Sequence, residues 1–120
     1  MTGTRDFTIR AGNTGTAQNE RGLVVRVKVD TTPLDLTGNT IVFRVTKDGT
    51  QVLRKDSLTG GITVDLPTAE IVVPITVAES RTLEAAGQGL TYDIERRATG
   101  VQRTILSGNI FVEPGANDDV

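Results

Sequence analysis

The chain contains no cysteine, no histidine and no tryptophan. These absences exclude a Cys-His dyad, a Ser-His-Asp triad and a zinc site built from cysteine or histidine. A disulfide cannot form either, so cysteine usage says nothing about the redox compartment. We therefore expect no catalytic, cofactor-binding or metal-binding residues, and we expect the protein not to be an enzyme.

Aromatic residues and net charge are also scarce. Aromatic side chains make up 3% of the 120 residues, too few to stack the bases of a single-stranded nucleic acid. Thirteen basic and 15 acidic residues leave a net charge of −2, whereas nucleic-acid-binding proteins usually carry a basic balance. No apolar run approaches the roughly 18 residues of a membrane span. The polar start, Met1 to Gly12, lacks the apolar stretch of a signal peptide. Neither nucleic acid nor membrane is an expected partner.

Alternation of apolar and polar residues is the main structural signal. Val25, Val27 and Val29 alternate with polar residues up to Asp30, which predicts a strand with these valines on its buried face. The same period of two predicts three further strands, carried by Ile41, Phe43 and Val45, by Leu90, Tyr92 and Ile94, and by Leu106, Gly108, Ile110 and Val112. The polar residues between them, such as Asp93 and Glu95, are expected to face solvent.

Shorter strands and their turns fill the intervals. Weaker patterns predict strands at 7–9, 51–55, 62–64 and 71–75. Asp48-Gly49 is a strong hairpin signal, and Thr99-Gly100 is expected to join the last two long strands. Pro74 predicts that its strand lies at an edge or ends there.

One segment, from Thr76 to Gly87, departs from the strand pattern. Thr76 followed by Glu79 matches a capping box, and Gly87 is suited to the C-terminal end of a helix. The segment predicts a helix of about two turns that crosses between strands, because its apolar face is narrow.

Together these patterns predict an all-β fold of seven to nine strands with one short helix near 77–86. Strands and helices do not alternate, so a parallel sheet is not expected. An immunoglobulin-like antiparallel two-sheet sandwich fits best, and a small barrel is the alternative. We expect a single domain over 1–120, with an ordered core at about 6–113 and frayed termini.

Carboxylates are the remaining candidates for chemistry. Asp93 and Glu95 share a strand face at a spacing of about 7 Å, which a glycosidase pair could use. An exposed polar row is the favoured interpretation. Three loop pairs could offer oxygens to calcium, although none has the spacing of an EF-hand: Asp48-Gly49, Asp56-Ser57 and Asp118-Asp119. Turn chemistry explains Asp48-Gly49 fully.

Other candidates have simpler interpretations. Gly12 to Gly15 lacks the Gly-Lys-Ser/Thr ending of a phosphate-binding loop, and a turn is favoured. Ser57, Ser80 and Ser107 lie in no nucleophile elbow and have no histidine to activate them. Arg96 and Arg97 must point to opposite faces of a strand. Arg97 would face outward with Glu95, and Arg96 is expected at the sheet end, as a rim charge or a docking residue.

Three stretches together resemble a known family. The start Asp6 to Gly15, the turn and strand Leu34 to Phe43, and the closing hairpin are similar to the immunoglobulin-like N-terminal domain of phage baseplate upper proteins and related tail proteins. The hairpin carries the resemblance in Gly89 to Glu95 and Thr104 to Val112. The resemblance spans residues 6–112. In those proteins a longer chain follows this domain, whereas seven or eight residues follow the last predicted strand here.

Residues of these stretches have physical roles of their own. Leu36 is expected to anchor its turn, and Asp35 and Thr37 to bond local backbone. Gly108 lies where a strand needs a bulge or a close backbone approach. Tyr92 is the one aromatic hydroxyl, expected to bond backbone where strands cross.

The resemblance implies a virion structural or assembly protein of a phage or prophage, associated with the tail or baseplate. Such a protein is made in the bacterial host cytoplasm and ends in the virion. Its expected partners are other virion proteins, or further copies of the same chain in a homo-oligomer. The alternative is a carbohydrate- or receptor-binding sandwich, although only Phe7, Phe43, Tyr92 and Phe111 could supply a stacking platform.

Overall fold

The computed structural model describes residues 3–12, 14 and 21–113. These residues form eleven strands and one helix. In chain order they are β1 (Gly3–Thr4), β2 (Phe7–Arg10), β3 (Leu23–Arg26), β4 (Lys28–Val29), β5 (Thr32–Pro33), β6 (Thr40–Lys47), β7 (Thr50–Asp56), β8 (Thr63–Asp65), β9 (Glu70–Val73), α1 (Val77–Ala86), β10 (Leu90–Ala98) and β11 (Val101–Glu113). The fold is all-β with one short helix, as predicted. Strand number exceeds the expected seven to nine because β1, β4 and β5 are two-residue pairings too short to give a sequence pattern.

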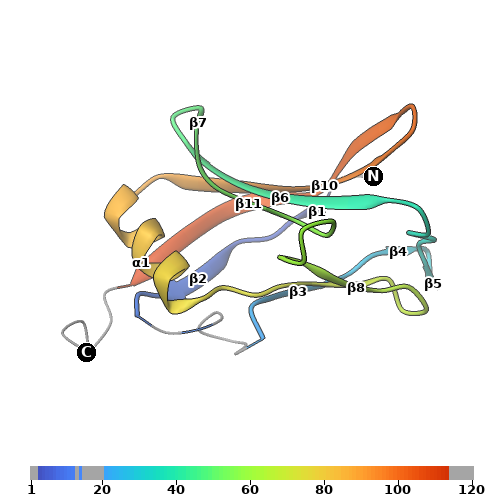
Figure 1. The fold of residues 1–120 in the computed structure, drawn as a ribbon, viewed down its shortest axis with the longest axis horizontal. Coiled ribbons are helices and arrows are strands. Elements are labelled where there is room, and N and C mark those ends of the chain that lie inside the picture. Colours follow the sequence, from blue (N-terminus) through green and yellow to red (C-terminus); the bar gives the residue numbers. More distant parts are fainter. Residues whose placement is uncertain (1–2, 13, 15–20, 114–120) are drawn as a thin grey trace.

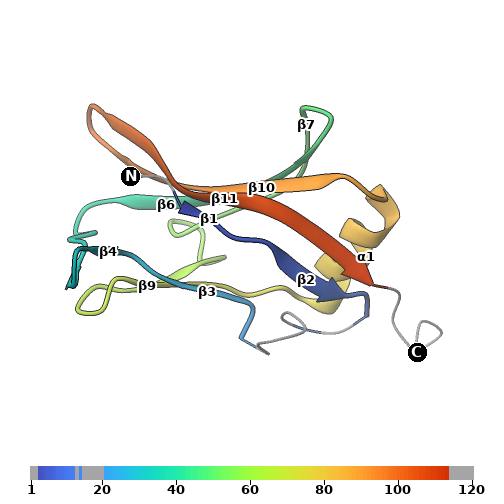
Figure 2. The same ribbon diagram turned by 180° about the vertical axis from the view of Figure 1, so that it is seen from behind.

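Two sheets face each other across the core. The larger sheet has the order β1-β11-β10-β6-β7, with β2 also paired to β11, and the smaller has the order β3-β9-β8. Figure 1 shows the large sheet above the small one, with α1 at one end; Figure 2 shows the same two layers from behind. The short β4–β5 ribbon lies at the other end of the molecule.

The predicted apolar rows form the core between the layers. Ile41, Phe43 and Val45 of β6 and Ile94 of β10 have no exposed surface. Opposite them lie the buried residues of the small sheet, among them Leu23 and Ile71. Burial of this size is the main stabilising contribution in such a domain, at about 25 cal/mol per Å² of apolar surface.

The expectation of a wholly antiparallel sheet was wrong. β1 and β2 pair with β11 in parallel, with Gly3 beside Leu106 and Phe7 beside Ile110. The next strand along the chain, β3, belongs to the small sheet in the opposite layer. Parallel partners come from distant segments, and no turn signal marks them.

The strand predicted over 25–30 was also partly wrong. β3 ends at Arg26, and Val29 is 61% exposed instead of buried. The chain bends at Val27, whose N–H donates to the Ala69 carbonyl and whose carbonyl accepts from the Leu34 N–H. Asp30 then adopts a positive φ and reverses the chain into the β4–β5 ribbon.

Turn and cap predictions were confirmed. The β6–β7 hairpin turns at Asp48 and Gly49, which both have positive φ. Thr76 accepts from the Glu79 N–H and Glu79 accepts from the Thr76 N–H, so the capping box forms. α1 has 10 residues, longer than the two turns expected, and buries Ser80 and Leu83. Pro74 directly follows Val73, the last residue of β9. Its strand therefore ends there, which was one of the two predictions for this proline.

Close contacts around Arg5, which lies between β1 and β2, fix this segment against β10 and β11 within the large sheet. The Tyr92 hydroxyl donates to the Arg5 carbonyl, and the N–H of Arg5 donates to Ser107 O at 2.9 Å. A Cβ added to Gly108 would lie 2.0 Å from the same Arg5 oxygen, so only glycine fits beside this backbone. Both roles were predicted. Leu36 is also buried, and Asp35 Oδ1 accepts from the Thr37 N–H at 3.0 Å.

Candidate docking site

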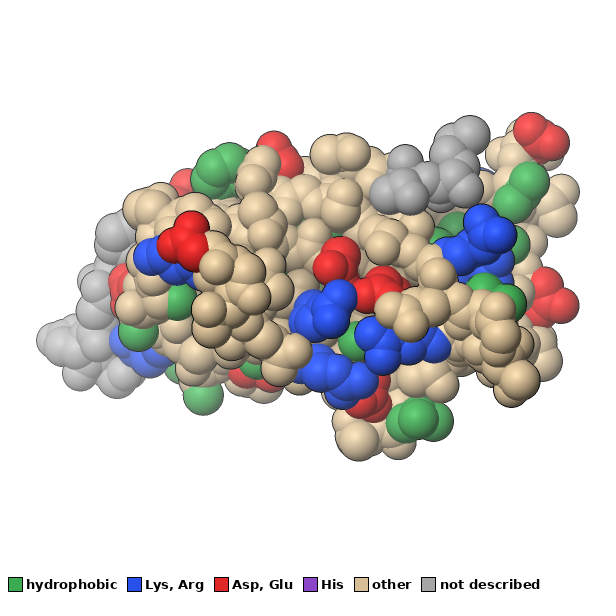
Figure 3. All heavy atoms as spheres, turned by 90° about the horizontal axis from the view of Figure 1, so that it is seen from above, with side chains coloured by type: hydrophobic (Ala, Val, Ile, Leu, Met, Phe, Trp, Pro, Cys, Tyr) green, Lys and Arg blue, Asp and Glu red, His purple; other side chains and the backbone are tan. Residues whose placement is uncertain are grey.

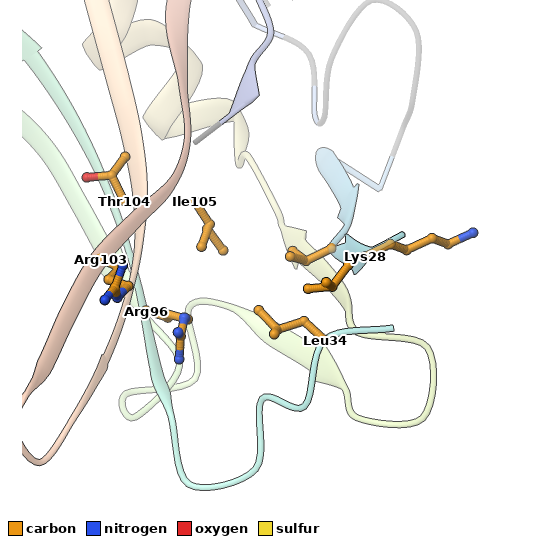
Figure 4. A pocket seen from close by; sticks show the side chains of 8 residues that line it. Lys28, Leu34, Arg96, Arg103, Thr104 and Ile105 are labelled. Carbon is orange, nitrogen blue, oxygen red and sulfur yellow. The ribbon is translucent and has the colours of Figure 1, made fainter. Parts of the chain in front are cut away.

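A pocket of about 500 Å³ opens between the β4–β5 end of the molecule and the β10–β11 hairpin. The residues that line it come from β4, β10 and β11, from the bend between β3 and β4, and from the position after β5: Val27, Lys28, Val29, Leu34, Arg96, Arg103, Thr104 and Ile105. In Figure 4, Leu34 and Ile105 project into the space, Arg96 and Arg103 lie side by side at its edge, and Lys28 points away from them.

The floor of this pocket is apolar. Val27, Leu34 and Ile105 are partly buried and pack against the core. Ile105 takes part in a β-bulge: Thr104 pairs with Glu95 and Leu106 with Ile94, which leaves Ile105 as an extra residue. A bulge re-aims side chains and twists the strand. The floor can therefore accept a small apolar side chain.

The charges around the pocket are all positive. Arg96 and Arg103 stand directly opposite each other across the β10–β11 pair. Arg96 donates to Asn39 Oδ1 at 3.3 Å, and neither arginine forms an ion pair with a carboxylate among the described residues. Like charges directly opposite across strands repel. The pair would be stabilised by an anion.

Six other arginines of the described residues are paired with carboxylates. Ion pairs with carboxylates are formed by Arg10, Arg21, Arg26, Arg44, Arg54 and Arg97. Within the described part of the chain, Arg96 and Arg103 thus form a basic pair without a carboxylate partner, although the net charge of the chain is −2. An anionic partner is favoured at this site.

The backbone beside the pocket is an unpaired strand edge. β1 pairs with β11 only at Leu106 and Ser107, and β2 only from Ile110 to Glu113. Among the described residues, Val101 to Arg103 therefore have no neighbouring strand on the side away from β10. Such an edge offers free N–H and C=O groups to an added strand. We refer to the pocket and this edge together as the basic edge site.

The outer face of the large sheet carries a second polar arrangement. Arg44 donates to Glu95 at 2.7 Å and to Asp93 at 3.4 Å, while Arg54 donates to Asp56 at 2.6 Å. Figure 3 shows basic and acidic side chains gathered in the middle of this face. The charges here satisfy one another.

Glu95 on this face is buried, with 4% of its surface exposed, so the expectation of a solvent-facing row was wrong for it. Glu95 pairs with Val42 on β6, and Val42 pairs in turn with Asp56 on β7. Both of these residues are buried as well. The long side chains of Arg44 and Arg54 occupy the adjacent row. Arginine stems cover neighbouring surface while their charged ends stay near water.

Asp93 and Glu95 therefore bind one guanidinium. Both accept from Arg44, so this arrangement is that of a structural ion pair, with one cation held between two carboxylates. Asp93 Oδ1 is buried without a hydrogen-bond partner. It borders a shallow depression lined by hydroxyl and amide groups of Thr46, Thr91, Thr104, Ser107 and Asn109.

The remaining sequence candidates serve turns and caps. Asp56 Oδ1 accepts from the N–H groups of Leu58 and Thr59, and the Thr59 and Arg54 contacts lower the Asp56 pKa to about 2. Asp48 lies in the hairpin turn, and Asp118-Asp119 falls outside the described residues. The described part of the chain holds no cluster of three potential metal-binding acidic residues.

The predicted glycine and serine candidates also have structural partners. Gly12 has a positive φ, and its N–H donates to Ser80 Oγ at 2.9 Å. Ser57 Oγ accepts from the Ile41 N–H at 3.0 Å. Ser107 borders the shallow depression. Asn13 and Gly15 lie outside the described residues.

Sequence reasoning found Arg96 and missed the rest of the basic edge site. The tight Thr99-Gly100 turn pairs Ala98 with Val101, and counting back along both strands places Arg96 opposite Arg103. The sequence could therefore have predicted that Arg96 and Arg103 lie side by side. Val27 and Leu34 come from elsewhere in the chain and gave none.

Within the described residues, no helix is long and apolar enough to cross a membrane. No protein-family model and no curated protein matches the chain.

Proposed function

We propose that the chain is an immunoglobulin-like, non-catalytic structural module of a phage or prophage virion, associated with the tail or baseplate, which acts by docking to other virion proteins. The observation that carries the docking role is the basic edge site, where an unpaired strand edge borders an apolar pocket with two uncompensated arginines. A partner would supply hydrogen bonds to the strand edge, an apolar side chain to the pocket and a negative charge to the arginines.

The strand order supports the immunoglobulin-like assignment. In that fold, strands C, F and G form one sheet and B, E and D the other. Here β6, β10 and β11 correspond to C, F and G, and β3, β9 and β8 to B, E and D. β7 extends the first sheet, as a C′ strand does in variable-type domains. The pairing of β1 and β2 with β11 departs from the constant-type order.

The virion assignment is supported by the residues that carry the resemblance. Leu36, Tyr92 and Gly108 perform in this fold the structural roles expected of them. A sandwich whose motif residues build the scaffold leaves its edges and loops for contacts. Docking through a strand edge and repetition by viral symmetry then suffice for the function.

Incorporation into particles tests the proposal. The chain, carrying an epitope tag, is expressed during induction of the phage or prophage that encodes it, and the particles are purified on a density gradient. We expect the tag in the particle fraction. Arg103→Glu should lower its amount at least tenfold, because it places a carboxylate beside the site intended for an anionic partner. Its control is Gln102→Glu, one residue away on the opposite strand face.

Two results would contradict the proposal. A chain that never enters the particles would not be a virion protein. A chain in which Arg103→Glu and Gln102→Glu enter equally well would not dock through the basic edge site.

A glycan-binding module is the second candidate, favoured by the shallow depression on the outer sheet face. Asp93 Oδ1 and several hydroxyl groups border it, and Phe111, 49% exposed, lies in the same strand row as Ser107 and Asn109. Sugars bind to such hydroxyl-rich surfaces beside an aromatic ring. A glycan array separates the candidates: binding that Asp93→Asn abolishes would favour the glycan-binding module.

A further inference from the structure

We propose that the pocket binds an acidic peptide segment of a partner protein, with one carboxylate between Arg96 and Arg103 and an aliphatic side chain on the apolar floor. This ligand assignment rests on the docking function proposed above and names the chemistry of the partner. Recognition uses the pocket and its two arginines, without a hydrogen bond to the strand edge.

The two arginines occupy the inner face of the large sheet, where apolar residues stand elsewhere. Arg96 pairs with Ile41 of β6 and lies two residues beyond Ile94, so it shares their face. Ile41 and Ile94 have no exposed surface, whereas Arg96 is half-buried and its cross-strand partner Arg103 is exposed. The pocket is therefore the open end of the sandwich, where the inner face of the sheet changes from apolar to cationic.

The arginine pair lacks a negative charge. Arg96 donates to a neutral acceptor, Asn39 Oδ1, at 3.3 Å, and no carboxylate among the described residues pairs with either arginine. Of the described residues that line the pocket, none is acidic. Each guanidinium has five N–H donors, so both can donate to one added carboxylate. Such a carboxylate relieves the repulsion between the arginines and accepts charge-assisted hydrogen bonds.

The floor determines what the carboxylate must be attached to. Val27, Leu34 and Ile105 are partly buried and form an apolar surface beside the arginines. In Figure 4, Leu34 and Ile105 project into the space. An aliphatic side chain laid on this floor removes apolar surface from water, whereas a free phosphate ion leaves the floor uncovered. A peptide carries both groups on one chain.

The arrangement of the cations sets the number and spacing of the groups in the ligand. Arg96 and Arg103 lie side by side in Figure 4, whereas Lys28 points away from them, so the pocket holds one carboxylate. In an extended peptide, residues two apart share a face at a spacing of roughly 7 Å. The corresponding residues of the site, Arg103 and Ile105, are likewise two apart on β11. We therefore expect the acidic and the aliphatic residue at positions i and i+2 of the ligand.

Titration with defined peptides tests the inference. The probe is acetyl-Gly-Glu-Gly-Leu-Gly-amide, whose blocked ends leave one carboxylate, added to the isotope-labelled full chain and followed by NMR. We expect saturable shifts of the Nε–H signals of Arg96 and Arg103 and of the backbone amide of Ile105. A probe with Gln in place of Glu, or with Gly in place of Leu, should bind at least tenfold more weakly. These changes in the probe leave the folding of the chain untouched.

A change in the chain tests the arginine pair. Arg103→Gln should weaken binding of the probe at least tenfold, because one guanidinium remains. Arg10→Gln is the matched control: it removes the same charge from the exposed ion pair with Glu113, at the other end of β11, and should bind like the unchanged chain. An ionic strength of about 1 M shortens the screening distance to about 3 Å and should weaken binding. Circular dichroism and thermal unfolding confirm that each variant is folded.

Four results would overturn the inference. They are a probe that causes no saturable shift, a Gln probe or a Leu-free probe that binds as tightly as the original, and equal binding by Arg103→Gln and Arg10→Gln. The fourth comes from inorganic phosphate. If phosphate binds at the arginine pair as tightly as the probe, the floor contributes nothing and the site accepts any anion.

Particle incorporation separates this ligand assignment from the docking function. If Arg103→Glu stays out of the particles and the probe does not bind, the chain docks here to a partner of different chemistry, and only the peptide assignment fails. If the probe binds and Arg103→Glu enters particles normally, the pocket recognises acidic peptides and the docking function fails.

Discussion

The guanidinium of Arg44 on β6 lies 2.7 Å from Glu95 Oε1 on β10, across the two central strands of the large sheet. Glu95 has 4% of its surface exposed, so its charge is largely removed from water. A buried carboxylate requires a paired cation and hydrogen bonds to remain ionised at acceptable cost. Arg97 supplies a further cation, with its Nε 3.6 Å from Glu95 Oε2.

A double-mutant cycle should measure this coupling. Glu95→Ala leaves Arg44 without its main partner and should lower the free energy of unfolding by about 3 kcal/mol. Arg44→Met with Glu95→Ala should cost less than the sum of the single changes by at least about 1 kcal/mol. Urea unfolding provides the values. The exposed pair Arg10–Glu113 is the control and should couple by less than about 0.5 kcal/mol. Additive changes at Arg44 and Glu95 would contradict the prediction.

Substitution of Gly108 should destabilise the large sheet. In Gly108→Ala the new Cβ meets the Arg5 carbonyl carbon and oxygen, which are backbone atoms with little freedom to move. The expected loss is about 3 kcal/mol, measured by thermal or urea unfolding. Gly61→Ala is the matched control, because its Cβ would lie 3.2 Å from the Lys55 side chain and 3.6 Å from the nearest backbone atom, the Asp56 carbonyl oxygen, which is an ordinary contact. Equal losses in the two variants would show that the close approach at Gly108 is unimportant.

Alkaline titration of the single tyrosine should report its burial. Burial raises the pKa of Tyr92, because it disfavours the phenolate, and the nearby Asp6 carboxylate acts in the same direction. The folded chain should show no tyrosinate absorbance near pH 10, where an exposed tyrosine is half ionised. The raised pKa stabilises the fold below the unfolded pKa of about 10, and this stability is lost as pH rises above it. Tyr92→Phe should remove that pH dependence and cost about 1 kcal/mol at neutral pH.

Acid should weaken the turn after β7. The Thr59 N–H and the Arg54 guanidinium hold the pKa of Asp56 at about 2, below the value of about 3.9 in an unfolded chain. A lowered pKa stabilises the fold above the unfolded pKa, and this contribution is lost as pH falls from about 4 towards 2. The difference in urea midpoint between the unchanged chain and Asp56→Asn should shrink over that range.

Much of the scaffold could be predicted because its signals are local. The rows of β6 and β10 repeat every two residues, Asp48-Gly49 tolerates positive φ, and Thr76 with Glu79 caps one helix end. Each pattern needs only residues close together in the chain. Helix, hairpins and the central core strands therefore follow from sequence alone.

The basic edge site could be predicted only in part. The register of the β10–β11 hairpin follows from its two-residue turn, and with it the pairing of Arg96 and Arg103. Whether these two arginines have a carboxylate partner depends on which strands pack beside them, and the sequence does not show that. The apolar floor needs Val27 and Leu34, brought there by the bend after β3 and by the β4–β5 ribbon.

By itself the sequence determined the long central strands and their apolar rows, where the helix begins, and which chemistries the missing cysteine and histidine exclude. Only the tertiary structure decided that β1 and β2 run parallel to β11, that Glu95 is buried and that Val29 is exposed. Local patterns record the period of one strand. Which strands become neighbours is decided by packing between distant segments, and that packing sets the burial of every charged side chain.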